Sequence, residues 1–308
     1  MKEIKILTGR MIKLYLKNPL SILFSFVYML LFIVLISLFL GDYMANGMTD
    51  VYAGVKGINF SHIRWLVDST AMAGVMMINC ILVPLNVLMI MVQDHSDSRL
   101  DSFLVSSVSR NKLVLGYWLA PFFVGTVMNI LCLFISEGFI VINGGACLSV
   151  QNTIKMIGLI TVNTFSVTSL FFIVAMLTKT VSLYSTFTGI ISAVVGFVTG
   201  AFLPIGVFPE GIQKIFAFIP AHHGATMMRE IMTQEPLAKT FSAVTDQMVK
   251  GTFMTAKEIV EVYSAENGII YLFGNVKVDF LNMLLIVIGS GIVFMGISVY
   301  LMRWYKKD

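Results

Sequence analysis

The polar residues that could do chemistry in this sequence are mostly amides set within long apolar stretches. They are Asn79, Asn86, Asn129 and Asn163, and the carboxyl group of Glu137 follows directly on one such stretch. Amides buried among apolar helices usually hydrogen-bond to neighbouring helices, and we expect that structural role; lining the path of a transported molecule is the alternative. Ionisable groups near a membrane interior are costly and often functional, although Glu137 is close enough to the end of its stretch to reach water.

Other patterns of chemistry are weak or absent in the sequence. Cys80, Cys132 and Cys147 form no CxxC pair and no Cys/His cluster with the spacing of metal ligands, so we expect free thiols and no metal site. The sequence also lacks the GxxxxGK[ST] phosphate loop of ATPases. His222 and His223 could form a pH-sensitive gate, but the favoured interpretation is that they are polar anchors at a membrane interface.

Six stretches of about 20 or more residues lack Asp, Glu, Lys and Arg, and they decide the fold class. A hydrocarbon layer of about 30 Å requires about 20 helical residues. The stretches are continuously apolar rather than alternating, which favours helices over strands of a barrel. The composition agrees, with 57% hydrophobic and only 12% charged residues. We therefore predict a single all-α membrane domain with spans at about 22–40, 69–92, 113–136, 156–177, 180–203 and 280–302.

The basic residues predict the orientation of the spans in a plasma membrane. Lys and Arg are enriched in cytoplasmic loops, and here they gather before the first span, in the connections after the second and fourth spans, and in the C-terminal tail. Both termini are then cytoplasmic. The segment 204–279 becomes extracellular; its six basic and eight acidic residues do not contradict this, because long segments translocate largely regardless of charge. We expect that the first apolar stretch, at 19 residues, is no cleavable signal.

The N-terminal residues 3–17 predict a helix that lies on the membrane surface. Ile4, Leu7, Met11 and Leu14 form one apolar stripe, and basic residues cover the rest of the helix. The Asn-Pro pair at 18–19 should end this helix before the first span. A basic anchor that only sets topology is the alternative.

The connection 93–112 is too polar to span the membrane. Leu100, Phe103, Leu104 and Val108 give it an apolar face at helical spacing. A short amphipathic helix of this kind could dock into a groove on a partner protein. A solvated linker whose apolar residues rest on lipid is the alternative.

The sequence after the fifth span predicts a broken hairpin. Residues 202–206, FLPIG, should break the helix, and a new helix should begin near Pro209 and Glu210. The apolar stretch up to Pro220 is too short to span, which predicts a re-entrant or interfacial hairpin. Residues beyond Arg229 should form a small, mainly helical external subdomain, in which Thr255 and Glu258 fit a capping box.

Taken in this order, these segments resemble the membrane subunits of ABC type-2 transporters. Residues 94–110, DHSDSRLDSFLVSSVSR, are similar to the coupling region of that family at Leu100, Asp101, Leu104, Val108, Ser109 and Arg110. Ser107 stands where the family usually has Pro, and Arg99 replaces a small residue. A second match is Phe208, Pro209 and Glu210, followed by Pro220 and Arg229. The resemblance covers the chain apart from the external segment 230–279, which is longer than usual.

The resemblance implies a permease that is not itself an enzyme. It implies a dimer with a second copy or a related permease, embedded in membrane lipid and driven by two cytoplasmic ABC ATPase subunits, which would bind the ATP and magnesium. A coupling helix at about 96–105 would contact the ATPase, and the expected contacts are Arg99, Leu100, Asp101, Phe103 and Leu104. No cofactor in this chain and no nucleic-acid partner are expected.

The function expected from the resemblance is export of an amphiphilic compound, such as a drug, an antimicrobial peptide or a lipid-like molecule, with multidrug efflux and antibiotic resistance as the corresponding roles. The near absence of charge in the spans suits such a cargo. It argues against an ion-coupled secondary transporter, which needs ionisable groups near mid-membrane. Export of a lipid-linked polysaccharide and a non-transporting immunity or sensor protein remain alternatives.

Overall fold

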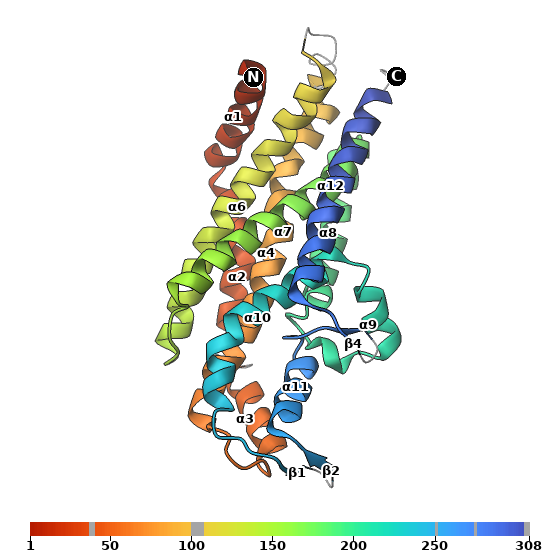
Figure 1. Ribbon diagram of the computed structural model, residues 1–308. Helices are drawn as coiled ribbons and strands as arrows, with labels where there is room; N and C mark the ends of the chain where they lie inside the picture. The colour runs from red at the N-terminus through yellow and green to blue at the C-terminus, as the bar shows by residue number, and fades with distance from the viewer. Residues whose placement is uncertain (37–40, 100–107, 250–251, 274–275, 305–308) are drawn as a thin grey trace.

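The computed structural model describes residues 1–36, 41–99, 108–249, 252–273 and 276–304. Long helices run side by side and form a bundle, with both termini at the same end, which we call the proximal end (Figure 1). A small subdomain closes the opposite, distal end. The helices of the bundle are α1 (Lys2–Lys17), α2 (Pro19–Leu35), α4 (Ile63–Ser96), α6 (Arg110–Ile142), α7 (Val150–Leu177), α8 (Val181–Val198), α10 (Pro220–Thr240) and α12 (Phe280–Trp304).

Five helices in the described part of the chain are long and apolar enough to cross a membrane, or six if the bent pair α1–α2 is one span. The structure thus confirms a mostly helical chain with five to six candidate spans. α4 is the most buried of them and forms the centre of the bundle, whereas the apolar windows of α8 and α12 are only 17% buried. Those two helices therefore leave most of their apolar surface for lipid or another protein.

The break predicted between the first two helices is present. α1 and α2 meet at Asn18 and are bent by 85°, and the Asn18 side chain caps α2 by accepting a hydrogen bond from the backbone N–H of Ser21. On α1, Leu7, Thr8, Met11 and Tyr15 are buried. Leu14 of the predicted stripe is exposed, whereas Tyr15 takes the position that packs against the protein one turn after Met11.

The fifth predicted span ends earlier than expected. α8 stops at Val198, and Gly200 adopts a left-handed conformation with φ of 66°. The helix therefore breaks before the Leu203–Pro204 pair that we expected to end it, because Gly enters the left-handed region with little cost. A short 3₁₀ turn, η3 (Ile205–Val207), and α9 (Glu210–Phe216) follow before α10 begins at Pro220.

The distal subdomain consists of α3 (Gly41–Tyr52), a 3₁₀ turn η2 (Phe60–His62), the hairpin β1 (Gln247–Val249) and β2 (Thr252–Met254), and α11 (Ala256–Glu266). A second hairpin, β3 (Leu272–Phe273) with β4 (Val276–Lys277), leads towards α12. Both hairpins are antiparallel, with Met248 opposite Phe253 and Phe273 opposite Val276. The segment after Arg229 thus contains two hairpins beside the expected helices, and their strands are only two or three residues long.

The distal subdomain has a hydrophobic core separate from that of the bundle. Its buried members come from α3, the start of α4, α11, and the connections that follow α3, α10 and α11: Met48, Tyr52, Val55, Ile58, Ile63, Leu66, Val67, Phe241, Val244, Ile259, Tyr263 and Ile269. The capping box predicted at the start of α11 is confirmed, because Thr255 accepts from the backbone N–H of Glu258, and the Glu258 carboxylate accepts from the backbone N–H of Thr255.

Candidate functional site

A network of charged and hydroxyl groups joins three helices at the proximal end. Asp94, in the last turn of α4, is only 1% exposed. The Arg10 guanidinium from α1 donates two hydrogen bonds to its two carboxylate oxygens at 2.5 and 2.7 Å. The Tyr117 hydroxyl from α6 donates a third at 2.9 Å. Two-pronged arginine–carboxylate pairing fixes geometry as well as charge, so Asp94 holds α1 and α6 in a set position beside the end of α4.

The segment predicted to couple to an ATPase begins immediately after this network. α4 ends at Ser96, and Ser98 takes a left-handed conformation with φ of 57° just after it. Arg99, the first of the five predicted contacts, lies 3.7 Å from Asp94 and 3.3 Å from Asp97. The other four predicted contacts, Leu100, Asp101, Phe103 and Leu104, lie outside the described residues.

Further contacts seat α1 on α6. The Glu3 carboxylate lies 3.0 Å from the ammonium group of Lys112, and the Thr8 hydroxyl donates to the Gly116 carbonyl at 3.0 Å. A Cβ at Gly116 would lie 2.7 Å from a methyl carbon of Leu7, so the two helices touch where α6 has no side chain. Sequence reasoning missed this seam because its members are 108 or 109 positions apart in the chain.

The predicted amides are in the interior of the bundle, but most of their bonds are local. Asn79 on α4 donates to the sulfur of Cys132 on α6 at 3.5 Å. Asn129 and Asn163 instead donate to carbonyls one turn earlier in their own helices, Gly125 at 2.8 Å and Leu159 at 2.9 Å. Within the described residues the Oδ1 atoms of all three have no hydrogen-bond partner. Asn86 is half-buried on α4.

Glu137 is buried near the distal end of α6 rather than open to water. Its Oε2 accepts a hydrogen bond from the backbone N–H of Leu148 at 2.6 Å, which ties the α6–α7 connection back to α6. Its Oε1 has no partner within the described part of the chain. Glu137 therefore has a structural role here, since its hydrogen bond holds the α6–α7 connection against α6.

A second charged cluster lies near the distal end of α4. Arg64 and Asp68, one turn apart on α4, form an ion pair at 3.0 Å. Arg64 also pairs with Asp42 of α3, and the amide of Asn143, directly after α6, donates to Asp68 at 3.0 Å. The two charged clusters thus lie at opposite ends of α4, and each connects it to other helices.

The predicted hairpin residues take positions at helix ends, except for Arg229. Pro209 directly precedes α9, Glu210 is its first residue, and Pro220 begins α10. Arg229 lies in the middle of α10, is fully buried, and donates to the carbonyl of Thr199 just after α8. Among the described residues, its Nε and Nη1 have no hydrogen-bond partner.

Three glycines from separate segments make room for the Arg229 guanidinium. A Cβ at Gly200 would lie 2.9 Å from Nη2, one at Gly74 would lie 3.0 Å from the same atom, and one at Gly268 would lie 3.4 Å from Nη1. The family-like position Arg229 was predicted from the sequence, but its burial was not. Nothing in the local sequence relates residue 229 to residues 74 and 268.

His222 and His223 are buried at the start of α10, which is not among the candidate spans. The Nε2 of His223 lies 2.8 Å from the carbonyl oxygen of Ala217, and both rings meet the edge or face of Tyr271, at centroid distances of 4.8 and 5.5 Å. Burial lowers the pKa of His222 to about 3 and lowers the pKa of His223. Both imidazoles are therefore neutral near pH 7 and pack as aromatic rings.

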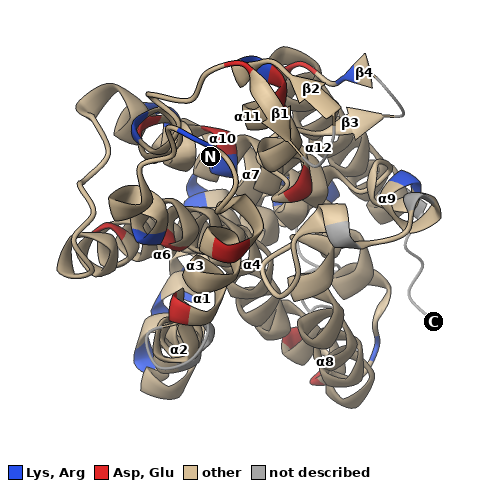
Figure 2. Ribbon diagram, turned by 90° about the horizontal axis from the view of Figure 1, so that it is seen from below, with Lys and Arg blue, Asp and Glu red and all other residues tan. Residues whose placement is uncertain are grey.

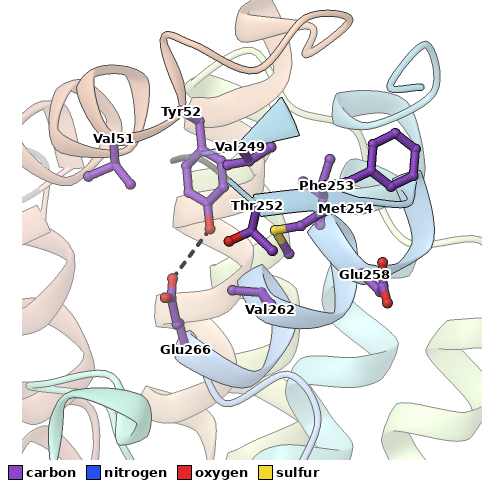
Figure 3. A pocket seen from close by; sticks show the side chains of 10 residues that line it. Val51, Tyr52, Val249, Thr252, Phe253, Met254, Glu258, Val262 and Glu266 are labelled. Carbon is purple, nitrogen blue, oxygen red and sulfur yellow. Dashed lines mark hydrogen bonds between the residues drawn. The ribbon is translucent and has the colours of Figure 1, made fainter. Parts of the chain in front are cut away.

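A pocket of about 590 Å³ opens in the distal subdomain between α3, the β1–β2 hairpin and α11 (Figure 3). Most of its lining is apolar, and two carboxylates, Glu258 and Glu266, also line it. The Tyr52 hydroxyl points towards Glu266 and donates to its carboxylate at 3.3 Å. This pocket was not predicted, because its walls come from segments about 200 residues apart.

This architecture defines a class: a multi-pass helical membrane protein whose charged networks lie towards the two ends of its central helix. A family model described as ABC-2 type transporter matches residues 2–233, and the chain belongs to that family. It is therefore an ABC-2 membrane permease domain without ATPase activity of its own. Permeases of this family generally pair with ABC ATPase subunits. No curated protein matches the sequence. Residues 234–308, which include α11 and α12, lie outside the family match.

Proposed function

We propose that this chain is the permease subunit of an exporter that moves an amphiphilic compound out of the cell. The energy comes from ATP hydrolysis by a separate ATPase subunit, which binds the ATP and magnesium. The cargo is a drug, an antimicrobial peptide or a lipid-like molecule, because the spans are apolar and carry few fixed charges. The working unit is a dimer with a second copy or a related permease, located in the plasma membrane with both termini in the cytoplasm.

The observation that carries the proposal is the Asp94 network. It holds α1, α4 and α6 together directly before the segment 96–105, which we propose as the coupling helix. In this arrangement the ATPase receives Arg99, Leu100, Asp101, Phe103 and Leu104 in a groove. Movement of that segment then passes to three helices at once, because Arg10 and Tyr117 both bind Asp94.

Two other parts of the proposal concern the membrane. α1 packs along the cytoplasmic end of α6, where its exposed basic residues meet anionic headgroups, and α2 follows it after the 85° bend at Asn18. The α9–α10 hairpin dips back from the outer side, with Pro209, Glu210, Pro220 and Arg229 at its turns and core. Broken helices at that depth require protein cover, and the burial of Arg229 supports such cover.

The decisive experiment combines purification with transport. Affinity-purified permease from its native membranes should retain a protein that contains a GxxxxGK[ST] loop, identified by mass spectrometry. Inside-out vesicles should accumulate a fluorescent amphiphile, rhodamine 6G, only with ATP. A permease that never retains such a protein and confers no ATP-dependent accumulation would contradict the exporter hypothesis and favour a sensor or immunity protein.

The coupling contact has its own test. Leu104→Asp should abolish retention of the ATPase without loss of membrane insertion, because an unpaired carboxylate would enter an apolar groove. Val150→Asp, an exposed apolar position at the distal start of α7, is the matched control and should retain the ATPase. Equal retention by both variants would show that the contact lies elsewhere.

A further inference from the structure

Two walls of the distal pocket pack against the hydrophobic core of the distal subdomain. Its α11 wall rests on the distal core through Ile259, and its α3 wall rests there through Tyr52. The Tyr52 ring packs edge-on against Phe241 and Tyr263 at centroid distances of 6.4 and 5.9 Å. The same ring faces the pocket (Figure 3). The α3 and α11 walls of the pocket are therefore supported from behind by buried side chains.

The rim of the pocket leaves large apolar side chains open to water. Phe253 on β2 is 63% exposed, Val51 on α3 is 55% exposed, and Val262 on α11 is 43% exposed. Single exposed apolar residues are ordinary, but a group that surrounds one cavity marks a binding site. The volume of about 590 Å³ lies within the range of about 300–1,000 Å³ that small-molecule sites occupy.

Two carboxylates, Glu258 and Glu266, give the pocket a negative charge. Glu258, Val262 and Glu266 follow one another at intervals of four residues, so they share one face of α11. The two carboxylates are then about 12 Å apart along the helix, with an apolar side chain between them. Capping hydrogen bonds to Thr255 lower the pKa of Glu258, so its carboxylate is ionised near pH 7. On the same helix, Lys257 pairs with Glu261, and neither residue lines the pocket.

We propose that this pocket binds a hydrophobic cation. The apolar part of the ligand packs among Val51, Phe253 and Val262, and its positive charge lies beside Glu266, against the face of Tyr52. An aromatic ring and a carboxylate together are a recurring way to hold an organic cation. Figure 2 views the molecule from this end and places acidic residues on α11 beside the β1–β2 hairpin. The same carboxylates repel an anionic lipid surface, so a membrane contact is the weaker interpretation.

The site is independent of transport, so its test needs no ATPase. The full-length permease is placed in nanodiscs of zwitterionic phosphatidylcholine. Binding of radiolabelled tetraphenylphosphonium is measured by equilibrium dialysis, with empty nanodiscs subtracted for partition into lipid. Tetraphenylborate, which has the same shape and the opposite charge, is the matched probe. We expect saturable binding of the cation and no saturable binding of the anion.

Variants then place the site. Glu266→Gln removes one negative charge near the cation. It should weaken binding about fivefold, because a charge pair at about 4 Å in water contributes about 1 kcal/mol. Glu261→Gln makes the same change on the same helix outside the pocket and should leave binding unchanged. Val262→Trp should crowd the part of the pocket between the two carboxylates and weaken binding. High salt should weaken binding to the parent protein more than to Glu266→Gln.

Three results would overturn the inference. Equal affinity in Glu266→Gln and Glu261→Gln would remove the carboxylate from recognition. Equal binding of tetraphenylborate would show an apolar surface that contacts lipid without regard to charge. Unchanged binding in Val262→Trp would place the cation outside this pocket. Failure of ATP-dependent transport would contradict the proposed export function without affecting these binding results.

Discussion

At the scale of single residues, Asp94 is a buried charge held by partners from two other helices. It is almost fully buried, yet it receives two hydrogen bonds from Arg10 and one from Tyr117. A buried carboxylate is stable only when such partners replace its hydration. Because the partners come from α1 and α6, the charge of Asp94 determines how those helices pack at the proximal end.

Replacing Asp94 with Asn should destabilise the permease by about 2 kcal/mol, since Arg10 then loses its counter-charge in a partly buried position. The expected result is a thermal unfolding midpoint in detergent lower by about 4 °C or more. Asp97→Asn, which changes an exposed carboxylate three residues later, is the control and should shift the midpoint by much less. Equal midpoints for the two variants would show that the buried network does not stabilise the fold.

At the scale of elements, the end of α8 depends on a glycine. Gly200 has φ of 66°, and the guanidinium of Arg229 occupies the space that a side chain there would need. Gly144, after α6, also has a positive φ of 88°, but open space surrounds it. The pair therefore separates the cost of backbone conformation from the cost of crowding.

Gly200→Ala should lower the unfolding midpoint more than Gly144→Ala. Both variants incur about 1–2 kcal/mol for a left-handed Ala, but only the first forces Arg229 to move from its bond with Thr199. The measurement is thermal unfolding of both variants side by side. If Gly144→Ala were equally or more destabilising, the packing of Arg229 against Gly200 would not contribute to the stability of the turn.

The sequence predicted a chain with about six candidate spans, of which the described residues show five or six, but it predicted the ends of the helices poorly. α4 extends from Ile63 to Ser96, although its charge-free stretch covers only 69–92, because Arg64, Asp68 and Asp94 find partners and remain helical. The break at Asn18 and the capping box at Thr255 were predictable, since each depends on neighbours in sequence. The Arg229 surroundings and the distal pocket were not, because they combine segments that only the fold brings together.

At the scale of the whole molecule, the two ends differ in what they expose. The α6–α7 connection that contains Cys147 lies at the end away from the termini (Figure 1). Cys147 is exposed, whereas Cys80 and Cys132 are buried. One native thiol can therefore report which side of the membrane the distal end faces.

With both termini in the cytoplasm, a membrane-impermeant maleimide should label Cys147 in intact cells. The buried thiols should not react, so Cys147→Ser should abolish labelling. Mass spectrometry of the labelled peptide identifies the site. Labelling that requires permeabilised cells would reverse the proposed orientation and place the distal pocket in the cytoplasm.

The length of α4 has a mechanical consequence. Its 34 residues make a rod of about 51 Å, fixed by Asp94 at one end and by Arg64 and Asp68 near the other. A rod of that length that tilts by about 5° moves its far tip by roughly 4 Å. Pro84, inside the helix, is where it can bend and absorb such a tilt. If α4 stays straight at Pro84, a movement of one end of the helix displaces the other end; if it bends there, the displacement becomes smaller.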